Sequence, residues 1–479
     1  MLFNSIDFAV FLTLVFGVYW FLVARSLKLQ NLFLLVMSYV FYGWWDWRFL
    51  SLIFMSSLID FLVGRALEAT PDPNRRRHLL WISLGANLGL LGFFKYFNFF
   101  VDSFAAAFRL GGIPFQVSSL NIVLPVGISF YTFQTMSYTI DIYRRRMAAT
   151  RDPIAFFAFV SFFPQLVAGP IERASNLLPQ FQQPRRFSYQ DGVAGLRLLL
   201  WGLAKKVMIA DLCARQVDQI FANYQSLPAP TLVLGALLFS FQIYGDFSGY
   251  SDMATGAARL LGFRLMRNFR TPYFALDVRE FWRRWHISLS TWFRDYCYIP
   301  LGGNRGGKWR QARNSLITFT VSGLWHGANW TFVVWGLLHG LYYLPSIFSA
   351  RKPRIAPAGA AAAGGPLAAL KTAARMFGTF WLVTGTWVFF RSASMTQALE
   401  YLARMCAWDL RRPAFSRDAL VTLALVALLL AAEWLQGDQE TPLELDRLPT
   451  AARWACYYLL IAGISAFYQE AKTFIYFQF

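Results

Sequence analysis

The chain has 479 residues, of which 56% are hydrophobic and 15% are charged, whereas soluble proteins contain about 25% charged residues. This excludes a disordered chain, and a single soluble domain does not fit either, because the 48 Phe and 18 Trp residues come in long runs rather than at an amphipathic period. The net charge of +19 would suggest nucleic acid as the partner of a soluble protein. Most basic residues lie between apolar runs, however, as expected for loops facing an anionic cytoplasmic leaflet, so we expect no nucleic acid partner.

The first third of the chain holds five apolar runs that approach the ~20 residues needed to cross a membrane. They lie near residues 8–22, 29–45, 49–64, 79–95 and 120–142. The first run has no basic region before it and no small-residue cleavage site after it, which predicts a retained span rather than a signal peptide. Basic residues cluster after the first, third and fifth runs: Arg25, Lys28, Arg65, Arg75, Arg76, Arg77, Arg144, Arg145, Arg146 and Arg151. The positive-inside rule then predicts that these clusters are cytoplasmic and that the N-terminus lies outside.

The middle of the chain is less regular. Apolar runs near residues 154–169, 192–213 and 230–250 are broken by Gly and Pro, which indicates backbone that is buried in protein or lines a cavity. Residues 276–313 are too charged to span, and later spans are expected near residues 315–346, 376–392, 419–436 and 453–469. The pattern predicts about eleven or twelve spans. They form one membrane-embedded domain, residues 1–479, with a flexible Ala/Gly/Pro-rich loop inserted at residues 351–372.

The histidines are the main candidates for chemistry. His326 lies in Ser322–Trp330, between a Trp and a Gly, inside a long apolar stretch. An imidazole at bilayer depth is costly and is by default a functional-site hypothesis, although a polar bond between helices is the alternative. His339 would lie on the opposite face of a continuous helix, which favours packing or interhelical bonding. His78 follows three arginines and is interpreted as a loop residue.

A fourth histidine lies in the charged and aromatic segment Phe281–Arg294. If this segment is helical, Trp282, His286 and Ser290 share one face. One interpretation is an interfacial amphipathic helix with an aromatic and Arg belt. The other is a re-entrant helix whose arginines attract a phosphate-bearing donor and whose histidine faces a cavity.

Two carboxylates, Asp246 and Asp252, lie in an apolar neighbourhood, so they either pair with Arg or line a polar cavity. The chain has no serine-hydrolase elbow, Walker loop, dinucleotide fingerprint or zinc-ligand spacing, and its four cysteines are not paired at metal-ligand spacing. We therefore expect no metal and no bound cofactor. Histidines within the membrane suit general acid or base work, because neutral imidazole titrates near physiological pH.

Eight segments of characteristic sequence cover the chain nearly end to end: residues 38–45, 93–98, 124–145, 165–172, 242–252, 281–303, 324–330 and 474–479. Together they resemble the membrane-bound O-acyltransferase family. The resemblance is to its bacterial branch that modifies exported polysaccharides, such as the alginate O-acetyltransferases, with the teichoic-acid D-alanylation membrane protein as a more distant relative. The last three segments, in this order, are the most specific.

The resemblance implies a fold in which the spans and re-entrant helices surround a central funnel. It implies that His326 is the general base and that His286 is the second catalytic position. An acyl thioester, most simply acetyl-CoA, would arrive from the cytoplasm at the bacterial inner membrane. A periplasmic partner of the SGNH-hydrolase type would then pass the acetyl group to an exported polysaccharide such as alginate.

Further residues are assigned by the same resemblance. The candidates for binding donor or substrate are Trp282, Arg283, Arg284, Ser290, Trp325 and Asn329. In the C-terminal motif Phe474–Phe479, Tyr476 carries the only hydroxyl and is a possible acyl acceptor, whereas an interfacial aromatic anchor is the alternative. Two other functions stay open: a transporter whose proton path uses His326, Asp246 and Asp252, or a lipid or protein acyltransferase of the same fold.

Overall fold

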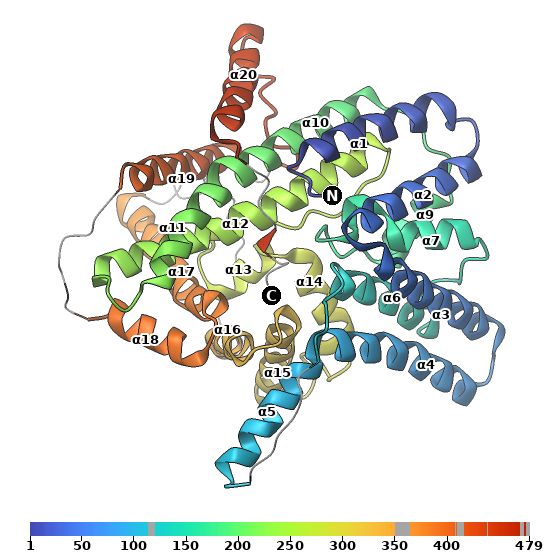
Figure 1. The fold of residues 1–479 in the computed structure, drawn as a ribbon, viewed down its shortest axis with the longest axis horizontal. Coiled ribbons are helices and arrows are strands. Elements are labelled where there is room, and N and C mark those ends of the chain that lie inside the picture. Colours follow the sequence, from blue (N-terminus) through green and yellow to red (C-terminus); the bar gives the residue numbers. More distant parts are fainter. Residues whose placement is uncertain are drawn as a thin grey trace. The chain divides into compact units, whose positions relative to one another are not determined.

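The computed structural model describes residues 1–113, 120–349, 365–407, 409, 416–437, 439–469 and 474–475. Throughout these residues the regular structure is helical and no β-strand occurs (Figure 1). This confirms the predicted all-α fold class. The chain forms two compact units, one from Met1–Val193 and Ala257–Leu265 and the other from Ala194–Gly256 and Met266–Phe479.

Five helical stretches of the described chain are long and apolar enough to cross a membrane: Leu27–Ala69, Pro73–Leu110, Ala229–Leu260, Trp330–Phe348 and Arg417–Gln436. The protein is therefore an all-α polytopic membrane protein. Other expected spans form shorter helices: those near residues 120–142 and 192–213 give α6 (Ile128–Tyr143) and α10 (Tyr189–Ala204), with 16 residues each. Both helices are shorter than the 18 residues required of the five stretches above, although each is rich in apolar side chains.

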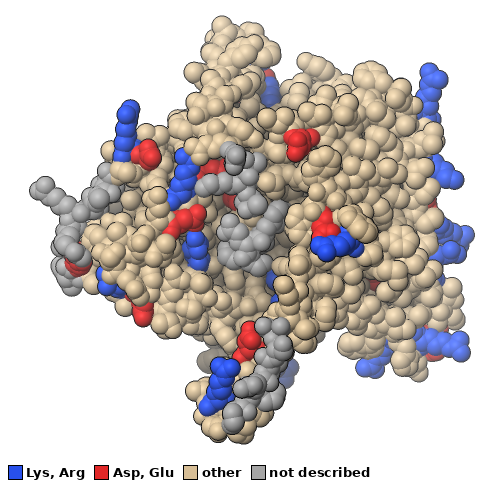
Figure 2. Space-filling model, viewed as in Figure 1, with Lys and Arg blue, Asp and Glu red and all other residues tan. Residues whose placement is uncertain are grey.

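In its described residues the first unit contains nine complete α-helices: α1 (Ile6–Gly17), α2 (Leu27–Asp46), α3 (Leu50–Ala69), α4 (Pro73–Leu91), α5 (Phe97–Leu110), α6, α7 (Pro153–Ser161), α8 (Phe163–Leu166) and α9 (Ala174–Phe181). Several begin where local sequence favours a helix start. The side chains of Ser5, Asp72 and Asp152 accept backbone N–H groups of the first turn, and proline follows both aspartates. Figure 2 shows Lys and Arg side chains along the edge of this unit where the α1–α2 and α3–α4 connections lie.

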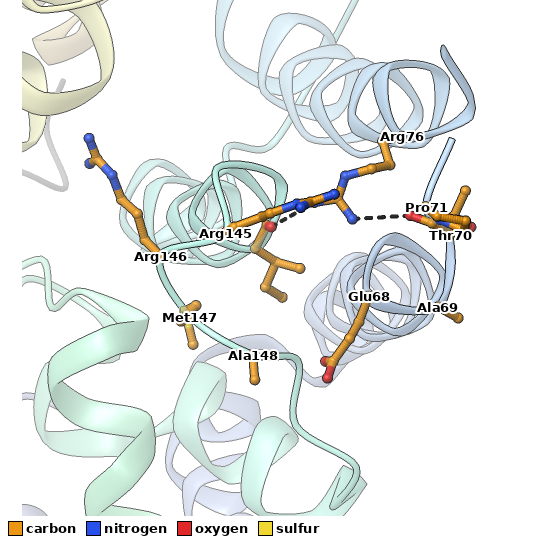
Figure 3. Close-up of a pocket in the computed structure, with 10 residues that line it drawn as sticks. Glu68, Ala69, Thr70, Pro71, Arg76, Arg145, Arg146, Met147 and Ala148 are labelled. Atoms are coloured by element: carbon orange, nitrogen blue, oxygen red, sulfur yellow. Dashed lines mark hydrogen bonds between the residues drawn. The ribbon is translucent and has the colours of Figure 1, made fainter. Parts of the chain in front are cut away.

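A buried arginine ties three helix ends of this unit together (Figure 3). Arg76 of α4 is 7% exposed, and its guanidinium donates to carbonyl oxygens of Leu67 and Thr70 at the end of α3 and of Ile142 and Tyr143 at the end of α6. These carbonyls lie at the ends of α3 and α6, where the regular i→i−4 ladder stops and the negative end of each helix dipole lies, and the Ile142 carbonyl also accepts the Arg145 N–H at 3.0 Å. Arg76 therefore caps two helices at once, beside an open pocket of about 660 Å³.

The second unit contains most of α10 and α12 (Ala229–Leu260) and the later helices. These are α11 (Asp211–Ala222), α13 (Val278–Arg284), α14 (Ile287–Phe293), α15 (Lys308–His326), α16 (Trp330–Phe348), α17 (Gly365–Arg391), α18 (Met395–Met405), α19 (Arg417–Gln436) and α20 (Thr450–Phe467). Helix α17 starts inside the segment expected to be a loop, residues 351–372, because Pro366 suits a first turn and Ala and Leu follow it. Residues 350–364 lie outside the described residues.

Helices α15 and α16 pack unusually closely. A Cβ atom at Gly323 would lie 2.3 Å from the carbonyl oxygen of Phe332, and one at Gly336 would lie 2.3 Å from the carbonyl oxygen of Phe319. Small residues allow such backbone contact between membrane helices. The two helices are separate, because Gly327 is extended and Asn329 caps α16. The single span predicted near residues 315–346 is therefore wrong, and the pair of helices turns at Gly327–Asn329.

Candidate active site

His326 is the last residue of α15 and is 2% exposed. Its ring centroid lies 5.0 Å from those of Trp325 and Trp335 and 5.5 Å from that of Phe390. The adjacent Gly327 fits because a Cβ atom there would lie 2.2 Å from the ring of Phe332. The turn after α15 therefore holds this imidazole among aromatic rings, where little water reaches it.

His286 joins α13 to α14 and is completely buried. Its backbone is left-handed, with φ 43° and ψ 54°. Its ring packs edge-on against Phe247, with centroids 4.6 Å apart, and its centroid lies 6.3 Å from that of His326. The structure thus brings together the two histidines predicted to be catalytic, from positions 40 residues apart in the sequence.

The helical face predicted for Trp282, His286 and Ser290 is wrong. Helix α13 ends at Arg284, and Trp285 is extended with φ −104° and ψ 128°, so the three side chains do not follow one helix. The indole N–H of Trp282 instead donates to Nδ1 of His339 at 3.3 Å. The hydroxyl of Ser290 donates to the carbonyl of Trp285 at 3.3 Å.

The other predicted binding residues have different surroundings. Arg283 is exposed, whereas Arg284 is buried and ion-paired with Glu280 at 2.8 Å. Asn329 uses both ends of its amide: its oxygen accepts the Thr331 N–H at 3.0 Å, and its nitrogen donates to the Ala393 carbonyl at 2.9 Å. Trp325 packs against His326. The roles of these residues in binding stay predictions.

His339 is held between helices, in agreement with the packing interpretation. Its Nδ1 accepts from Trp282, and its Nε2 lies 2.9 Å from the hydroxyl of Thr386 on α17. That hydroxyl donates its own proton to the Val383 carbonyl at 2.7 Å, so Nε2 of His339 is the donor. Both ring nitrogens are therefore engaged in contacts that join α13, α16 and α17.

Asp246 and Asp252 pair with lysine rather than with arginine. The Lys206 ammonium lies 2.8 Å from Asp246 and 2.9 Å from Asp211, and the Lys205 ammonium lies 2.6 Å from Asp252. Neither lysine was among the candidates predicted from the sequence, although two adjacent ammonium groups inside an apolar run indicate buried partners. These ion pairs occupy both carboxylates that a proton path would use.

The described part of the C-terminal motif is docked into the second unit. Phe474 and Ile475 are each 2% exposed. The backbone N–H of Ile475 donates to Asp246 at 2.7 Å, and the ring of Phe474 lies 5.8 Å from that of Phe247, the residue packed on His286. Tyr476 follows directly in the sequence and lies outside the described residues.

No group of three His, Cys, Asp or Glu side chains in the described chain is arranged to hold a metal ion. The comparisons with known proteins bear on the chemistry instead. The model of the membrane-bound O-acyltransferase family matches residues 143–354. The probable alginate O-acetylase of Azotobacter vinelandii is 42% identical over 439 residues, which cover 90% of this chain and 83% of the relative.

The chain belongs to the membrane-bound O-acyltransferase family. The peptidoglycan O-acetyltransferase of Helicobacter pylori is 36% identical to this acyltransferase over 418 residues, which cover 80% of this chain and 75% of the relative. The teichoic acid D-alanyltransferase of Streptococcus thermophilus is 30% identical over 236 residues, which cover 45% of this chain and 55% of the relative. The resemblance seen in the sequence is thereby confirmed, and the family-model match includes both His286 and His326 of this acyltransferase.

Proposed function

We propose that this enzyme O-acetylates an exported polysaccharide, using acetyl groups delivered from acetyl-CoA in the cytoplasm. The names of its relatives support the acceptor class, since they act on alginate and on peptidoglycan. The proposed reaction is supported mainly by the buried pair His286 and His326, whose ring centroids are 6.3 Å apart. At that separation one small group bound beside both rings can contact each imidazole.

His326 acts as the general base. A thioester is already activated, whereas a hydroxyl becomes a good nucleophile only when a base takes its proton. His326 removes the proton, the hydroxyl oxygen bonds to the acyl carbon, and the carbon–sulfur bond breaks as the proton passes to the leaving thiolate. The aromatic rings around His326 exclude water, which protects the thioester from hydrolysis.

Tyr476 is the first acceptor in this proposal. The docking of Phe474 and Ile475 beside Phe247 and Asp246 supports it, because it anchors the chain one residue before the tyrosine. The tyrosyl ester then gives its acetyl group to a periplasmic SGNH-hydrolase-type transferase, which acylates the polysaccharide. Of the predicted binding residues, the exposed Arg283 is the one best suited to the phosphates of the donor.

The enzyme resides in the bacterial inner membrane with its N-terminus in the periplasm. The basic clusters of the first unit face the cytoplasm, as the positive-inside rule requires. The row of Lys and Arg side chains along one edge of that unit supports this orientation (Figure 2). Acetyl-CoA would then enter from the side that carries these clusters.

The test is acetyl transfer from labelled acetyl-CoA by the full-length enzyme in proteoliposomes that contain the periplasmic transferase and polysaccharide. We expect His326→Ala to lower the rate by about 10²–10⁴-fold, the usual contribution of a general base. The control is His78→Ala, because His78 is exposed on α4 of the other unit. Its interpretation as a loop residue is wrong, since α4 already begins at Pro73. His326→Ala with more than about a tenth of wild-type activity would exclude the base assignment. Label recovered in lipid or protein but never in polysaccharide would exclude the acceptor class.

A further inference from the structure

Asn268 lies in the segment between α12 and α13, and its buried side-chain amide contacts His286. Oδ1 of Asn268 lies 3.1 Å from Nδ1 of His286. Asn268 is 2% exposed, and both His286 and its neighbour Ser288 are fully buried. An amide buried this deeply is costly unless its oxygen and nitrogen are both bonded.

Hydrogen bonds to Ser288 and Ser251 fix which end of the amide faces His286. The backbone N–H of Ser288 lies 3.2 Å from Oδ1 of Asn268, and the Ser288 hydroxyl donates to the same atom at 2.9 Å. A backbone N–H can only donate, so this end of the amide is the oxygen. The nitrogen end, Nδ2, donates to the Ser251 hydroxyl at 3.2 Å. The amide orientation therefore follows from its partners.

This orientation determines where the proton of His286 lies. An amide oxygen carries no hydrogen, so the nitrogen 3.1 Å away, Nδ1, is the donor. The Ser288 hydroxyl also lies 3.4 Å from Nδ1, but it gives its proton to Oδ1 of Asn268 at the shorter distance of 2.9 Å. In a neutral imidazole the other nitrogen, Nε2, then carries a lone pair. Nε2 is buried and has no hydrogen-bond partner among the described residues. It is available to accept a proton or a hydrogen bond from a substrate.

Asn268 also stabilises the backbone next to His286. His286 is left-handed, which is uncommon for any residue other than glycine and persists where neighbouring groups enforce it. The carbonyl of Asn268 accepts the N–H of Ile287 at 2.9 Å, and its side chain accepts the N–H of Ser288. One residue thus bonds the two amides that follow His286 as well as the ring itself.

We propose that Asn268 is a positioning residue for acyl transfer, which keeps the proton of His286 on Nδ1 and presents Nε2 to the hydroxyl or thiol group in the site. The inference rests on the proposed role of His286. A merely structural asparagine would stabilise the turn between α13 and α14 without controlling the tautomer. The experiments below separate these two possibilities.

The direct readout is the ¹⁵N spectrum of the full-length protein labelled at histidine, with His286 assigned by its loss in His286→Ala. We expect the wild-type ring to carry its proton on Nδ1, and Asn268→Ala to lose that single tautomer. A wild-type ring protonated on Nε2 would overturn the proposal without any variant. So would an unchanged tautomer in a folded Asn268→Ala protein.

Activity provides the second readout. We expect Asn268→Ala to lower acetyl transfer by about 10–100-fold, the size of loss known for groups that orient the imidazoles of metal sites. Ser288→Ala keeps the bond between Asn268 and His286 and should lose much less. Asn314→Ala is the matched control, because Asn314 is equally buried but bonds Gly303 and Arg313. Equal losses of activity in Asn268→Ala and Asn314→Ala would mean that Asn268 has only a structural role.

Asn268→Asp keeps the acceptor oxygen and adds a charge that favours the imidazolium. We expect its activity to recover at alkaline pH, with the acid limb of the pH–rate profile moved upward by about 1–3 units. Among the described residues, His326 is the titratable group whose ring contacts His286. Other ionisable groups on the packed elements and the segments that join them include Tyr244, Asp246, Tyr250, Asp252, Arg259, Arg267, Arg270, Arg279, Glu280, Arg283, Arg284, Arg294, Lys308, Arg310 and Arg313. An unshifted limb in folded Asn268→Asp would contradict the proposal.

Comparing the activities of His286→Ala and Asn268→Ala distinguishes a failure of this inference from a failure of the proposed function. If His286→Ala retains wild-type activity, the proposed role of His286 in acetyl transfer is wrong. The control of the His286 tautomer by Asn268 is then still tested by the ¹⁵N spectrum. If His286→Ala is inactive but Asn268→Ala is fully active with a mixed tautomer, the proposed function survives and the positioning role of Asn268 is wrong.

Discussion

Replacing Gly323 with alanine tests whether the contact between α15 and α16 holds His326 in place. The new Cβ atom would lie 2.3 Å from the carbonyl oxygen of Phe332, whereas an ordinary contact begins at 3.4 Å. The obstacle is backbone, so no side-chain rotation relieves it, and the helices must separate by roughly 1 Å. His326 ends α15 three residues later and moves with the helix.

The expected loss follows from that displacement. A shift of about 1 Å in a reacting geometry costs about 10²-fold in rate, and overpacking costs about 1–3 kcal/mol of stability. The assay is the initial rate of acetyl transfer in proteoliposomes, together with the midpoint of thermal unfolding in detergent. Gly385→Ala in α17 is the control, because nothing lies within 4 Å of a Cβ atom there.

Two results would refute this reasoning. Gly323→Ala could keep the wild-type rate and unfolding midpoint, which would mean that the close contact is not needed to place His326. Alternatively, Gly385→Ala could lose as much activity as Gly323→Ala, which would make the loss a general effect of alanine in these helices. A slow but fully stable Gly323→Ala enzyme would still support a positional effect on His326.

We expect His286→Ala to impair acetyl transfer strongly and His78→Ala to have no effect, and equal mild losses in both would argue against a catalytic His286. In a cysteine-free background, Arg75→Cys should react with an impermeant maleimide from the cytoplasmic side and Asp102→Cys from the periplasmic side, since both positions are exposed. The reverse labelling would overturn the positive-inside assignment. Tyr476→Phe should abolish transfer to polysaccharide while the donor still binds. Acylation of polysaccharide at the wild-type rate by this variant would mean that the C-terminal motif serves only as an anchor.

The fold class was predictable because long apolar runs with few charges suit only a membrane protein. His326 could also be singled out as a candidate from the sequence, since an imidazole in such a run is exceptional. The break after it was not predictable, because a Gly in an apolar stretch is also compatible with one continuous helix. The ring of Phe332 fills the space where a side chain at residue 327 would be, which explains why this position is glycine.

The surroundings of His286 could not be predicted from local pattern. The spacing of Trp282, His286 and Ser290 is helical, yet the chain turns at Trp285 and His286 because Asn268 bonds the following amides. Asn268 is separated from His286 by 18 residues, and no periodicity connects them. The same holds for Lys205 and Lys206, whose carboxylate partners lie on another helix.

The left-handed backbone at His286 has a consequence for protein engineering. If residue 286 served only the chain path, glycine would suit it better, since any other residue there costs about 1–2 kcal/mol. His286→Gly would relieve that strain but would also lose the packing of the ring on Phe247 and its hydrogen bond to Asn268, so thermal stability reports the balance of the two effects, whereas a screen for acetyl transfer would remove this variant. Stability-guided redesign of this acyltransferase should accordingly hold position 286 constant, together with Asn268, which supports the strained turn.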